Sequence, residues 1–348
     1  MQDQTLTPEP LLHHIPRERG SQLDALLVLW SRDEPDRVGE LVLIPPGPAQ
    51  QVWFFGRNSA TPLPHDHLGL FRQRPGSLEG TGGLLAPRVS RQQLRLQRTT
   101  SGVLEVENLG RCPMRHQGLE AKHATLREGE TLELVDQLLL LHVRRPLQLP
   151  PLPPELQVAL QPFGEADDVG IVGEGPAVWE MRRQLAFVAR RQTHVLILGP
   201  SGTGKELAAR ALHLRSSRSK LPMVSRNAAT IPETLIDAEL FGNARNYPNA
   251  GMPERPGLVG EADATTLFLD EIGELPIALQ SHLLRVLDQG EYQRLGETTR
   301  RTSSLRLVAA TNRPETDLKH DLLARLQSRL TLPDLNTRRE DIPLITRH

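Results

Sequence analysis

The sequence predicts two domains of different class, an N-terminal all-β sandwich and a following α/β domain built on a parallel sheet. Residues 23–145 contain short apolar or alternating runs separated by Gly, Pro and polar clusters, which is the pattern of short strands. A proline-rich run at 146–154 then interrupts this pattern. Beyond it, helical spacing of apolar residues alternates with runs that are apolar throughout, which is typical of a parallel sheet covered on both faces.

The first domain is predicted to consist of strands alone. The expected strands are 26–30, 41–44, 52–55, 94–97, 104–109, 131–135 and 138–143, and period-two alternation is clearest in 104–107 and 132–134. This half contains no convincing helical pattern, so one sheet packed on another is the expected architecture. The segment 58–87, rich in Pro, Gly and His, is predicted to be a long loop.

The second domain is predicted to alternate strands and helices. The expected strands are 195–198, 267–269 and 305–309. Two helices are indicated by apolar residues at helical spacing, namely Val178, Met181, Leu185 and Val188 in the first and Leu279, Leu283, Val286 and Leu287 in the second. The predicted organisation is a tail at 1–20, the sandwich at 21–146, a Pro-rich linker at 147–168, the α/β domain at 169–335 and a last segment at 336–348.

Composition restricts the class of partner. The 348 residues include 41 Lys and Arg against 42 Asp and Glu, so no overall basic surplus favours nucleic acid or an anionic membrane. No apolar run approaches the roughly 20 residues that a membrane span needs. The single cysteine, Cys112, fits a reducing compartment and is most simply a small structural residue. We therefore expect a cytoplasmic protein without membrane contact.

A glycine loop lies between the predicted strand 195–198 and the helix that follows it. Glycines let backbone N–H groups approach phosphate oxygens, the helix N-terminus favours an anion, and a lysine at the end of the loop reaches the terminal phosphates. An ordinary glycine-capped turn is the alternative, and Glu206 stands where many such loops carry a magnesium-binding Ser or Thr. The candidate nucleotide-binding residues are Gly199, Pro200, Ser201, Gly202, Thr203, Gly204, Lys205 and Glu206, together with Val172 and Gly173.

Polar residues end the next two predicted strands. Asp270 and Glu271 follow the apolar run 267–269, at the edge where ligands of open parallel sheets collect. We expect Asp270 to hold Mg²⁺, and Glu271 to orient and deprotonate the water that attacks the γ-phosphate. Asn312, at the end of the other strand, is expected to sense the γ-phosphate. The alternatives are two acids that cap a turn, and an asparagine that merely ends a strand.

From residue 170 onward the chain resembles the AAA+ domain of bacterial sigma-54-dependent transcription activators. The matching stretches are GPSGTGKELAARALH, ELFGNAR, TLFLDEIGELP, LLRVLDQGEYQRLG, AATNR and REDIPL. The resemblance implies an ATPase that uses ATP and Mg²⁺ and works as a ring oligomer, and in this family Glu after the loop lysine is usual. It also implies that Asn227 couples the catalytic glutamate to the bound nucleotide.

The resemblance implies arginines that act across the ring interface. By residue matching, Arg325 in LLARL is the retained arginine finger, and Lys319 stands where the family has another arginine. A lysine keeps the charge but lacks the planar fork, so it should stabilise the transition state less. The stretch from Asn312 to Lys319 is shorter than in typical members, and an exposed helix charge is the alternative for Arg325.

Two departures from the family bear on function. Where members carry the GAFTGA loop that contacts sigma-54, this chain has Asn246-Tyr247-Pro248-Asn249-Ala250-Gly251, without the contacting Phe and Thr. Sigma-54 polymerase is therefore a doubtful partner. The sequence given stops at His348, where the family begins a helical lid followed by a helix-turn-helix. We expect 336–348 to be the start of that lid, no DNA-binding domain in this chain, and weaker nucleotide affinity and ring assembly.

The first half resembles a forkhead-associated (FHA) domain, a reader of phosphothreonine. The matching stretches are FGR at 55–57, VSRQQ at 89–93, ENLG at 107–110 and LREGETL at 126–132. The resemblance assigns Arg57, Ser90 and Arg91 to the phosphopeptide, and an arginine with a hydroxyl suits a phosphate dianion. Gln93 replaces the usual histidine and 111–114 replaces the usual Ser-Thr-Asn-Gly turn. A structural or docking sandwich is the alternative.

Two functions follow from these residues. The first is the ATP-binding module of a sigma-54-type transcription regulator, coupled to a phosphopeptide sensor. The second is a nucleotide-binding, phosphorylation-dependent interaction protein that no longer remodels polymerase.

Overall fold

The computed structural model describes residues 22–46, 51–60, 63–99, 103–153 and 161–348. The chain divides into two units. The sandwich unit consists of Met1–Ala166, Val172–Trp179 and Arg338–His348. The α/β unit consists of Asp167–Ile171 and Glu180–Thr337. The predicted tail 1–20 and residues 154–160 of the predicted linker lie outside the described residues, and the predicted domain boundaries stay predictions.

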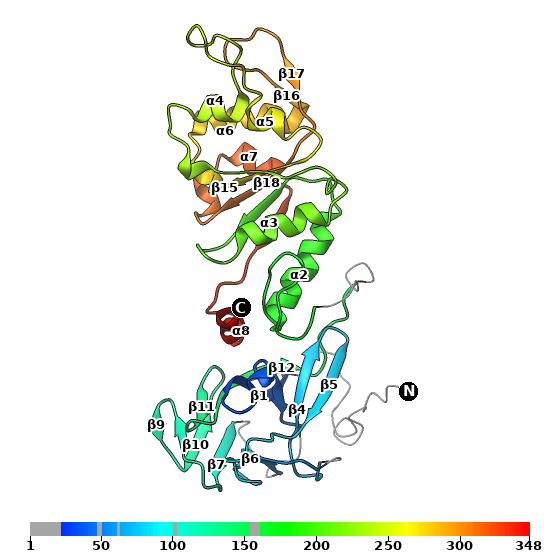
Figure 1. The fold of residues 1–348 in the computed structure, drawn as a ribbon, viewed down its shortest axis with the longest axis vertical. Coiled ribbons are helices and arrows are strands. Elements are labelled where there is room, and N and C mark those ends of the chain that lie inside the picture. The colour runs from blue at the N-terminus through cyan, green and yellow to red at the C-terminus, as the bar shows by residue number, and fades with distance from the viewer. Residues whose placement is uncertain (1–21, 47–50, 61–62, 100–102, 154–160) are drawn as a thin grey trace. The chain divides into compact units, whose positions relative to one another are not determined.

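Two antiparallel sheets form the sandwich unit (Figure 1). The larger sheet has the order β5-β4-β2-β1-β12-β11-β8-β9 and the smaller the order β10-β7-β6-β3. The strands are β1 (Gln22–Ser31), β2 (Leu41–Leu43), β3 (Val52–Phe55), β4 (Leu70–Arg74), β5 (Ser77–Gly82), β6 (Leu94–Arg98), β7 (Leu104–Asn108), β8 (Met114–His116), β9 (Leu119–Glu120), β10 (His123–Leu126), β11 (Thr131–Leu134) and β12 (Leu138–Pro146).

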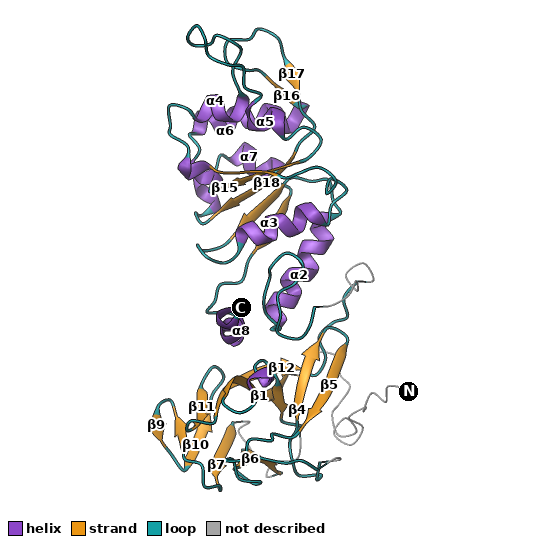
Figure 2. Ribbon diagram, in the orientation of Figure 1, coloured by secondary structure: helices purple, strands orange, loops and turns teal. Residues whose placement is uncertain are grey.

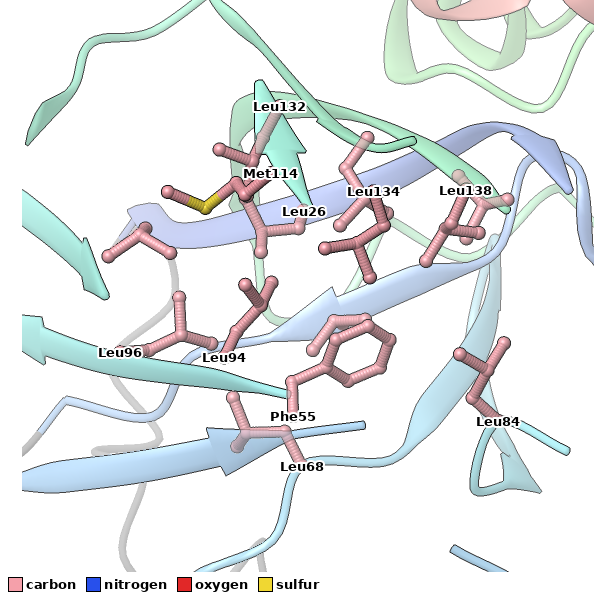
Figure 3. Packing of buried hydrophobic residues seen from close by; sticks show 14 of the residues in the cluster. Leu26, Phe55, Leu68, Leu84, Leu94, Leu96, Met114, Leu132, Leu134 and Leu138 are labelled. Carbon is pink, nitrogen blue, oxygen red and sulfur yellow. The ribbon is translucent and has the colours of Figure 1, made fainter. Parts of the chain in front are cut away.

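The core of this unit lies between its two sheets. Figure 3 shows Leu26 and Leu132 from the larger sheet packed with Phe55 and Leu94 from the smaller one, and all four are fully buried. In β7 the buried Leu104 and Val106 alternate with exposed or half-buried residues, as the sequence pattern predicts. The prediction of a β-rich N-terminal region is confirmed: it forms two antiparallel sheets that share a core.

One prediction for this unit is wrong. The segment 58–87, predicted to be a long loop, contains β4 and β5, which pair with each other antiparallel. Phe71 of β4 is also paired with Leu41 of β2, so the hairpin extends the larger sheet. Sequence patterns did not reveal this hairpin because β5 has the sequence SLEGTG, in which apolar residues do not alternate with polar ones. The strand is held by backbone pairing to β4.

The α/β unit is built on a five-stranded parallel sheet with the order β14-β15-β18-β13-β19 (Figure 2). Its strands are β13 (Val195–Leu198), β14 (Val224–Asn227), β15 (Thr266–Asp270), β18 (Arg306–Thr311) and β19 (Ser328–Thr331), and a small ribbon is formed by β16 (Glu291–Tyr292) and β17 (Arg301–Thr302). Among the described residues the α-helices are α2 (Pro176–Ala189), α3 (Lys205–Leu214), α4 (Ile236–Phe241), α5 (Gly257–Glu261), α6 (Ile277–Gln289), α7 (His320–Arg325) and α8 (Ile342–Arg347).

The alternation of helices and strands is confirmed. The helix expected around 178–188 is α2, and the second expected helix is α6, which buries Leu279, Leu283 and Val286 as the spacing predicts. Strand β18 is buried at every position, in keeping with a central strand of a sheet covered on both faces. Among the described residues, no helix combines the length and the apolar character that crossing a bilayer requires.

A buried arginine ties helix α2 to the start of β18. Arg306 is 1% exposed, and its guanidinium donates to the carbonyl oxygens of Val188 (2.9 Å) and Ala189 (3.0 Å). It also donates to the carbonyl oxygen of Thr193 at 3.1 Å. The last carbonyls of a helix lack partners within the helix and favour a cation. Burial lowers the pKa of Arg306 to about 10, so the charge is retained at neutral pH.

We expect Arg306→Met to lower the free energy of unfolding by about 3–5 kcal/mol, because three buried carbonyl groups lose their donor. Urea denaturation followed by circular dichroism measures the change. Arg210→Met, at an exposed position of α3, is the matched control and should stay within about 0.5 kcal/mol. A loss below about 1 kcal/mol for Arg306→Met would contradict the assigned role.

Candidate nucleotide-binding site

The parallel register brings the predicted site residues to one edge of the sheet. Leu198, the last residue of β13, lies opposite Thr311 at the end of β18. Asn227, the last residue of β14, lies opposite Asp270 at the end of β15. Because parallel strands all run the same way, their carboxyl ends share an edge, and ligands of open α/β sheets bind there. The glycine loop, Asp270 and Glu271 all follow strands at this edge.

The glycine loop has the backbone conformation that its composition predicts. Gly202 (φ +79°) and Gly204 (φ +92°) adopt left-handed conformations that residues with a side chain rarely take. Helix α3 begins at Lys205, directly after Gly204, so the N–H groups of its first turn are available to an anion. The Thr203 hydroxyl donates to the carbonyl oxygen of Pro200 at 2.9 Å and closes the turn.

Lys205 lies folded back over this loop. Its side chain is 7% exposed, and Nζ donates to the carbonyl oxygens of Gly199 (3.1 Å) and Pro200 (3.3 Å). Nζ also lies 3.5 Å from Oε1 of Glu271. A buried ammonium needs such partners because desolvation of an unpaired charge is costly. The charges of Lys205 and Glu271 therefore compensate each other.

Glu271 is held in a strained backbone conformation. Its φ of +51° lies in the left-handed region, which costs a non-glycine residue about 1–3 kcal/mol unless the surroundings enforce it. The Glu271 N–H donates to Oδ1 of Asp270 at 3.0 Å, and Oε2 of Glu271 accepts the N–H of Asn312 at 3.1 Å. The structure thus brings together Lys205, Asp270, Glu271 and the backbone of Asn312, which the sequence placed at separate strand ends.

Asn227 contacts Asp270. Its Nδ2 donates to Oδ2 of Asp270 at 3.4 Å, and its Oδ1 accepts the N–H of Ala229 at 2.9 Å. The family resemblance had linked Asn227 to the catalytic glutamate, whereas here the amide lies against the neighbouring aspartate. The cause is the β14–β15 register, which sets Asn227 opposite Asp270. The coupling role itself stays a prediction.

Asp270 has the chemistry of a ligand for a hard cation. Burial raises the pKa of its carboxyl and the nearby charge of Glu271 raises it further, while the N–H of Glu271 and the charge of Lys205 act in the opposite direction. Carboxylate oxygen is the protein ligand that Mg²⁺ prefers, usually as one or two carboxylates together with substrate phosphates. Asp270 therefore fits the predicted metal, while the exposed Glu206 offers no hydroxyl ligand after the loop lysine.

Arg325 and Lys319 both contact helix α6. The Arg325 guanidinium forms a two-pronged ion pair with Asp288, with Nη2 to Oδ2 at 3.2 Å, and both side chains are substantially exposed. Lys319, at the start of α7, donates from Nζ to Oγ of Ser281 at 2.8 Å. Neither contact involves the glycine loop, and action across a subunit interface stays a prediction for both residues.

Val172 and Gly173 belong to the sandwich unit, apart from the glycine loop in the α/β unit. The N–H groups of Glu174 and Gly175, which follow them, both donate to Oδ1 of Asp341 at 2.8 Å. Sequence reasoning missed Asp341 as a contributor, although it lies within the matching stretch REDIPL. The assignment of Val172 and Gly173 to the nucleotide stays a prediction.

The sandwich unit has an open cavity of about 910 Å³ at two of its three predicted phosphopeptide residues. Arg57 and Arg91 line it, and Asp66 adds an opposing charge. Ser90 is not among the lining residues, and its Oγ accepts the N–H of Arg111 at 3.1 Å. The full lining is Arg57, Asn58, Ser59, Ala60, Pro64, Asp66, His67, Leu85, Arg91 and Gln92.

Gln93, which departs from the FHA pattern, is a buried structural residue. Its Nε2 donates to Oδ1 of Asn108 (2.6 Å) and to the carbonyl oxygen of Cys112 (2.8 Å), and its Oε1 accepts the N–H of Ser90 (3.0 Å). The side chain therefore fixes the segment that carries Ser90 and Arg91 against the end of β7. The sequence marked Gln93 only as a departure, because an exposed and a buried glutamine look alike in a sequence.

The loop that replaces GAFTGA is closed by its own side chains. Nδ2 of Asn243 donates to the carbonyl oxygens of Ala244 and Pro253, each at 3.0 Å. Oδ1 of Asn246 accepts the N–H of Gly251 at 2.9 Å. Tyr247 and Met252 are 39% and 37% exposed, so an aromatic and a thioether side chain remain accessible on this loop.

We expect Asp270→Asn to raise the free energy of unfolding at pH 7 when neither nucleotide nor metal is added. Burial raises the pKa of Asp270, so the ionised carboxylate is disfavoured in the fold and stability falls as the pH rises through that pKa. The gain should be smaller at pH 5, where the carboxyl is more protonated. Urea denaturation without nucleotide or metal measures it, with the exposed Glu261→Gln as control. A loss of stability at pH 7 would contradict this account.

About half of the chain, including most of the α/β unit, is similar to known proteins. Residues 171–332 match the family model described as the sigma-54 interaction domain. The chain is 40% identical to the regulatory protein AtoC of Escherichia coli (strain K12) over 222 residues. This aligned region covers 62% of this chain and 48% of AtoC. It is 43% identical over 185 residues to the DNA-binding transcriptional regulator NtrC of Klebsiella pneumoniae, which covers 51% of this chain and 39% of NtrC.

A solved structure, NtrX from Brucella abortus in complex with ATP, is 36% identical and superposes with a TM-score of 0.47 over 51% of this chain and 41% of NtrX. The chain spans about half the length, or less, of the curated relatives it matches. Residues 171–332 form a sigma-54 interaction domain of the AAA+ type, homologous to those of AtoC and NtrC.

Proposed function

We propose that this chain is the ATP-binding AAA+ module of a sigma-54-type transcription regulator and that its sandwich reads a phosphorylated partner. One observation carries the ATPase part of the proposal. Lys205 and Glu271 lie 3.5 Å apart at the carboxyl edge of the parallel sheet, beside a glycine loop and the first turn of a helix. This pairing of a phosphate-binding cation with a base beside it is what phosphoryl transfer to water requires.

Binding begins with an exchange of partners at Lys205. The ammonium now donates to two loop carbonyls and faces Glu271. A triphosphate supplies more negative charge than these groups, so Lys205 turns to the phosphates while the loop N–H groups and the first turn of α3 bind the remaining oxygens. Asp270 would hold Mg²⁺, which supplies charge neutralisation across the phosphates when bound.

Hydrolysis then depends on Glu271. Once Lys205 has turned away, Oε1 of Glu271 is free to accept a proton from water, while Oε2 stays fixed by the N–H of Asn312. This fixed geometry aims the carboxylate, and positioning supplies much of the rate in phosphoryl transfer. Arg325 acts on the nucleotide of a neighbouring subunit after it leaves Asp288, and Lys319 contributes a weaker charge.

We expect Glu271→Gln to reduce ATP turnover at least about 100-fold and to tighten MgATP binding about threefold to tenfold. The amide cannot act as a base, and it no longer competes with the phosphates for Lys205. Turnover as a function of protein concentration and calorimetry with MgATP measure the two effects. Lys205→Ala is the companion variant and should abolish binding.

Turnover that is equal in the wild type and Glu271→Gln would remove the enzyme proposal. An absence of calorimetric heat for the folded wild-type chain with MgATP would remove nucleotide binding as well. A rise of specific activity with protein concentration would support a composite site between subunits.

A second candidate is a nucleotide-binding interaction protein that does not remodel sigma-54 polymerase. The loop 246–251 favours it, because the Phe and Thr of GAFTGA are absent and Asn246 closes the loop on Gly251. Retention of the chain by immobilised sigma-54 in the presence of MgATP separates the candidates, since the interaction protein would not be retained.

The cavity at Arg57 and Arg91 supports the sensor part of the proposal. Two guanidinium groups that line one open cavity suit a phosphate dianion, and Gln93 fixes the backbone beside Arg91. The two-sheet architecture with a common core is compatible with an FHA domain. Asp66 in the lining opposes an anion, which favours the alternative of a docking sandwich.

We expect Arg57→Ala to weaken binding of a phosphothreonine peptide library at least about tenfold, because a hydrogen bond to a charged group contributes about 1.5–3 kcal/mol. Fluorescence anisotropy measures the affinity. Arg95→Ala is the control, since Arg95 on β6 pairs with Glu107 and lies outside the cavity lining. Equal binding of the unmodified library by the wild type would contradict a phosphate reader.

A further inference from the structure

Charges of both signs line the open cavity of the sandwich unit. Arg57 and Arg91 contribute two positive charges, and Asp66 contributes a negative one. Arg57 is half-buried, the other two residues are exposed, and none of the three side chains has an ion-pair partner among the described residues. Elsewhere in this unit such groups are paired, as Arg98 is with Asp24. The cavity therefore offers charges that a ligand can pair with.

The two arginines start from neighbouring points of the backbone. The N–H of Arg57 donates to the carbonyl oxygen of Ser90 at 3.0 Å, and Arg91 is the next residue. Gly56 makes this approach possible, because a Cβ there would lie 2.3 Å from the carbonyl oxygen of Ser90 and 2.5 Å from that of Arg91. The segments that carry the two guanidinium groups are thus fixed against each other.

The segment that carries Asp66 is fixed to the same frame. Nε2 of the buried His67 lies 2.8 Å from the carbonyl oxygen of Arg91, and it donates because a carbonyl oxygen only accepts. The carbonyl oxygen of Asp66 accepts the N–H of Phe54, and the N–H of Leu68 donates to the carbonyl oxygen of Phe54, each at 2.8 Å. The backbone of Asp66 is therefore held beside β3, while its side chain remains exposed.

This arrangement of charges restricts the ligand. Two guanidinium groups suit a phosphate dianion, but a phosphate alone would also face the carboxylate of Asp66. A ligand that carries a cation beside its phosphate would satisfy all three side chains. The cavity of about 910 Å³ lies near the upper end of the range of about 300–1,000 Å³ for ligand pockets, so it also admits residues that flank the phosphorylated one.

We propose that this cavity binds a phosphopeptide in which a lysine or arginine lies close to the phosphorylated residue. The phosphate pairs with Arg57 and Arg91, and the cation of the peptide pairs with Asp66. The inference rests on the proposed phosphopeptide-reading function and specifies the class of peptide. Nucleic acids and anionic membranes present negative groups without a fixed cation, so they would leave Asp66 opposed by like charge.

The test uses the full chain and fluorescently labelled libraries of peptides that each carry a single phosphothreonine. The flanking positions are basic (Lys and Arg), neutral (Asn and Gln) or acidic (Asp and Glu), and a further library repeats the basic flanks with unmodified threonine. Anisotropy measures the affinities. We expect the wild type to bind the basic phosphorylated library about threefold to fivefold more tightly than the neutral one, as for an exposed ion pair, and to bind the acidic one most weakly.

Substitution of Asp66 separates a specificity role from a structural one. Asp66→Asn should abolish the preference for basic flanks and strengthen binding of the neutral phosphorylated library about twofold, because the phosphate no longer faces a carboxylate. A variant that had lost its fold would instead bind every library more weakly. Asp66→Lys should prefer the acidic library. Glu105→Gln is the matched control, since Glu105 is an exposed carboxylate of β7 outside the cavity lining, and it should keep the wild-type order of affinities.

Equal affinity for the basic and neutral phosphorylated libraries, with binding still lost in Arg57→Ala, would overturn the inference and leave the phosphopeptide reader intact. A preference for basic flanks that persists in Asp66→Asn would also overturn it, as would a single-stranded oligonucleotide that binds as tightly as the basic phosphorylated library. Binding of the unmodified basic library as tight as that of the phosphorylated one, or no binding of any phosphorylated library by the wild type, would remove the proposed phosphopeptide function itself.

Discussion

The parallel register of the five-stranded sheet is the constraint on which the candidate site depends. Leu198 lies opposite both Thr311 of β18 and Thr331 of β19, and Asn227 lies opposite Asp270. The groups that the site brings together, Lys205, Asp270, Glu271 and the backbone of Asn312, are spread over residues 205–312, and only the common carboxyl edge makes them neighbours. A slip of one residue between β14 and β15 would turn Asn227 to the other face of the sheet and remove its contact with Asp270.

Features encoded within a short stretch of sequence could be predicted, whereas features made by pairing could not. The strand before the glycine loop, the loop itself and helix α6 each have a local pattern, and the structure has them where the pattern puts them. Strand β5 has no such pattern, because its partner β4 supplies the pairing. The hydrogen bond from the N–H of Asn312 to Glu271 involves a backbone group, so the type of side chain at position 312 does not predict it.

Buried charge is the second feature that the sequence conceals. Arg306 and Glu40 are each 1% exposed, although arginine and glutamate are usually surface residues. Arg306 is satisfied by helix carbonyls, and Glu40 by Arg37, Arg72 and the Thr81 hydroxyl. In each unit a buried charged side chain fixes the packing of neighbouring elements. Its partners are distant in sequence, so the sequence does not show which of the many charged residues are buried.

Two ion pairs of the α/β unit, Arg325–Asp288 and Lys205–Glu271, differ in exposure, and this difference orders the steps of the proposed catalytic cycle. The Arg325–Asp288 pair is 44% and 37% exposed, so solvent screens it and its release costs little free energy. Lys205 and Glu271 are 7% and 16% exposed, and separating them without a new anion leaves two buried charges unpaired. In the proposed cycle a neighbouring subunit therefore attracts the arginine readily, whereas only a ligand with several negative charges displaces the lysine. The proposal accordingly puts nucleotide binding before any step that needs Glu271, because Lys205 engages this carboxylate until the phosphates replace it.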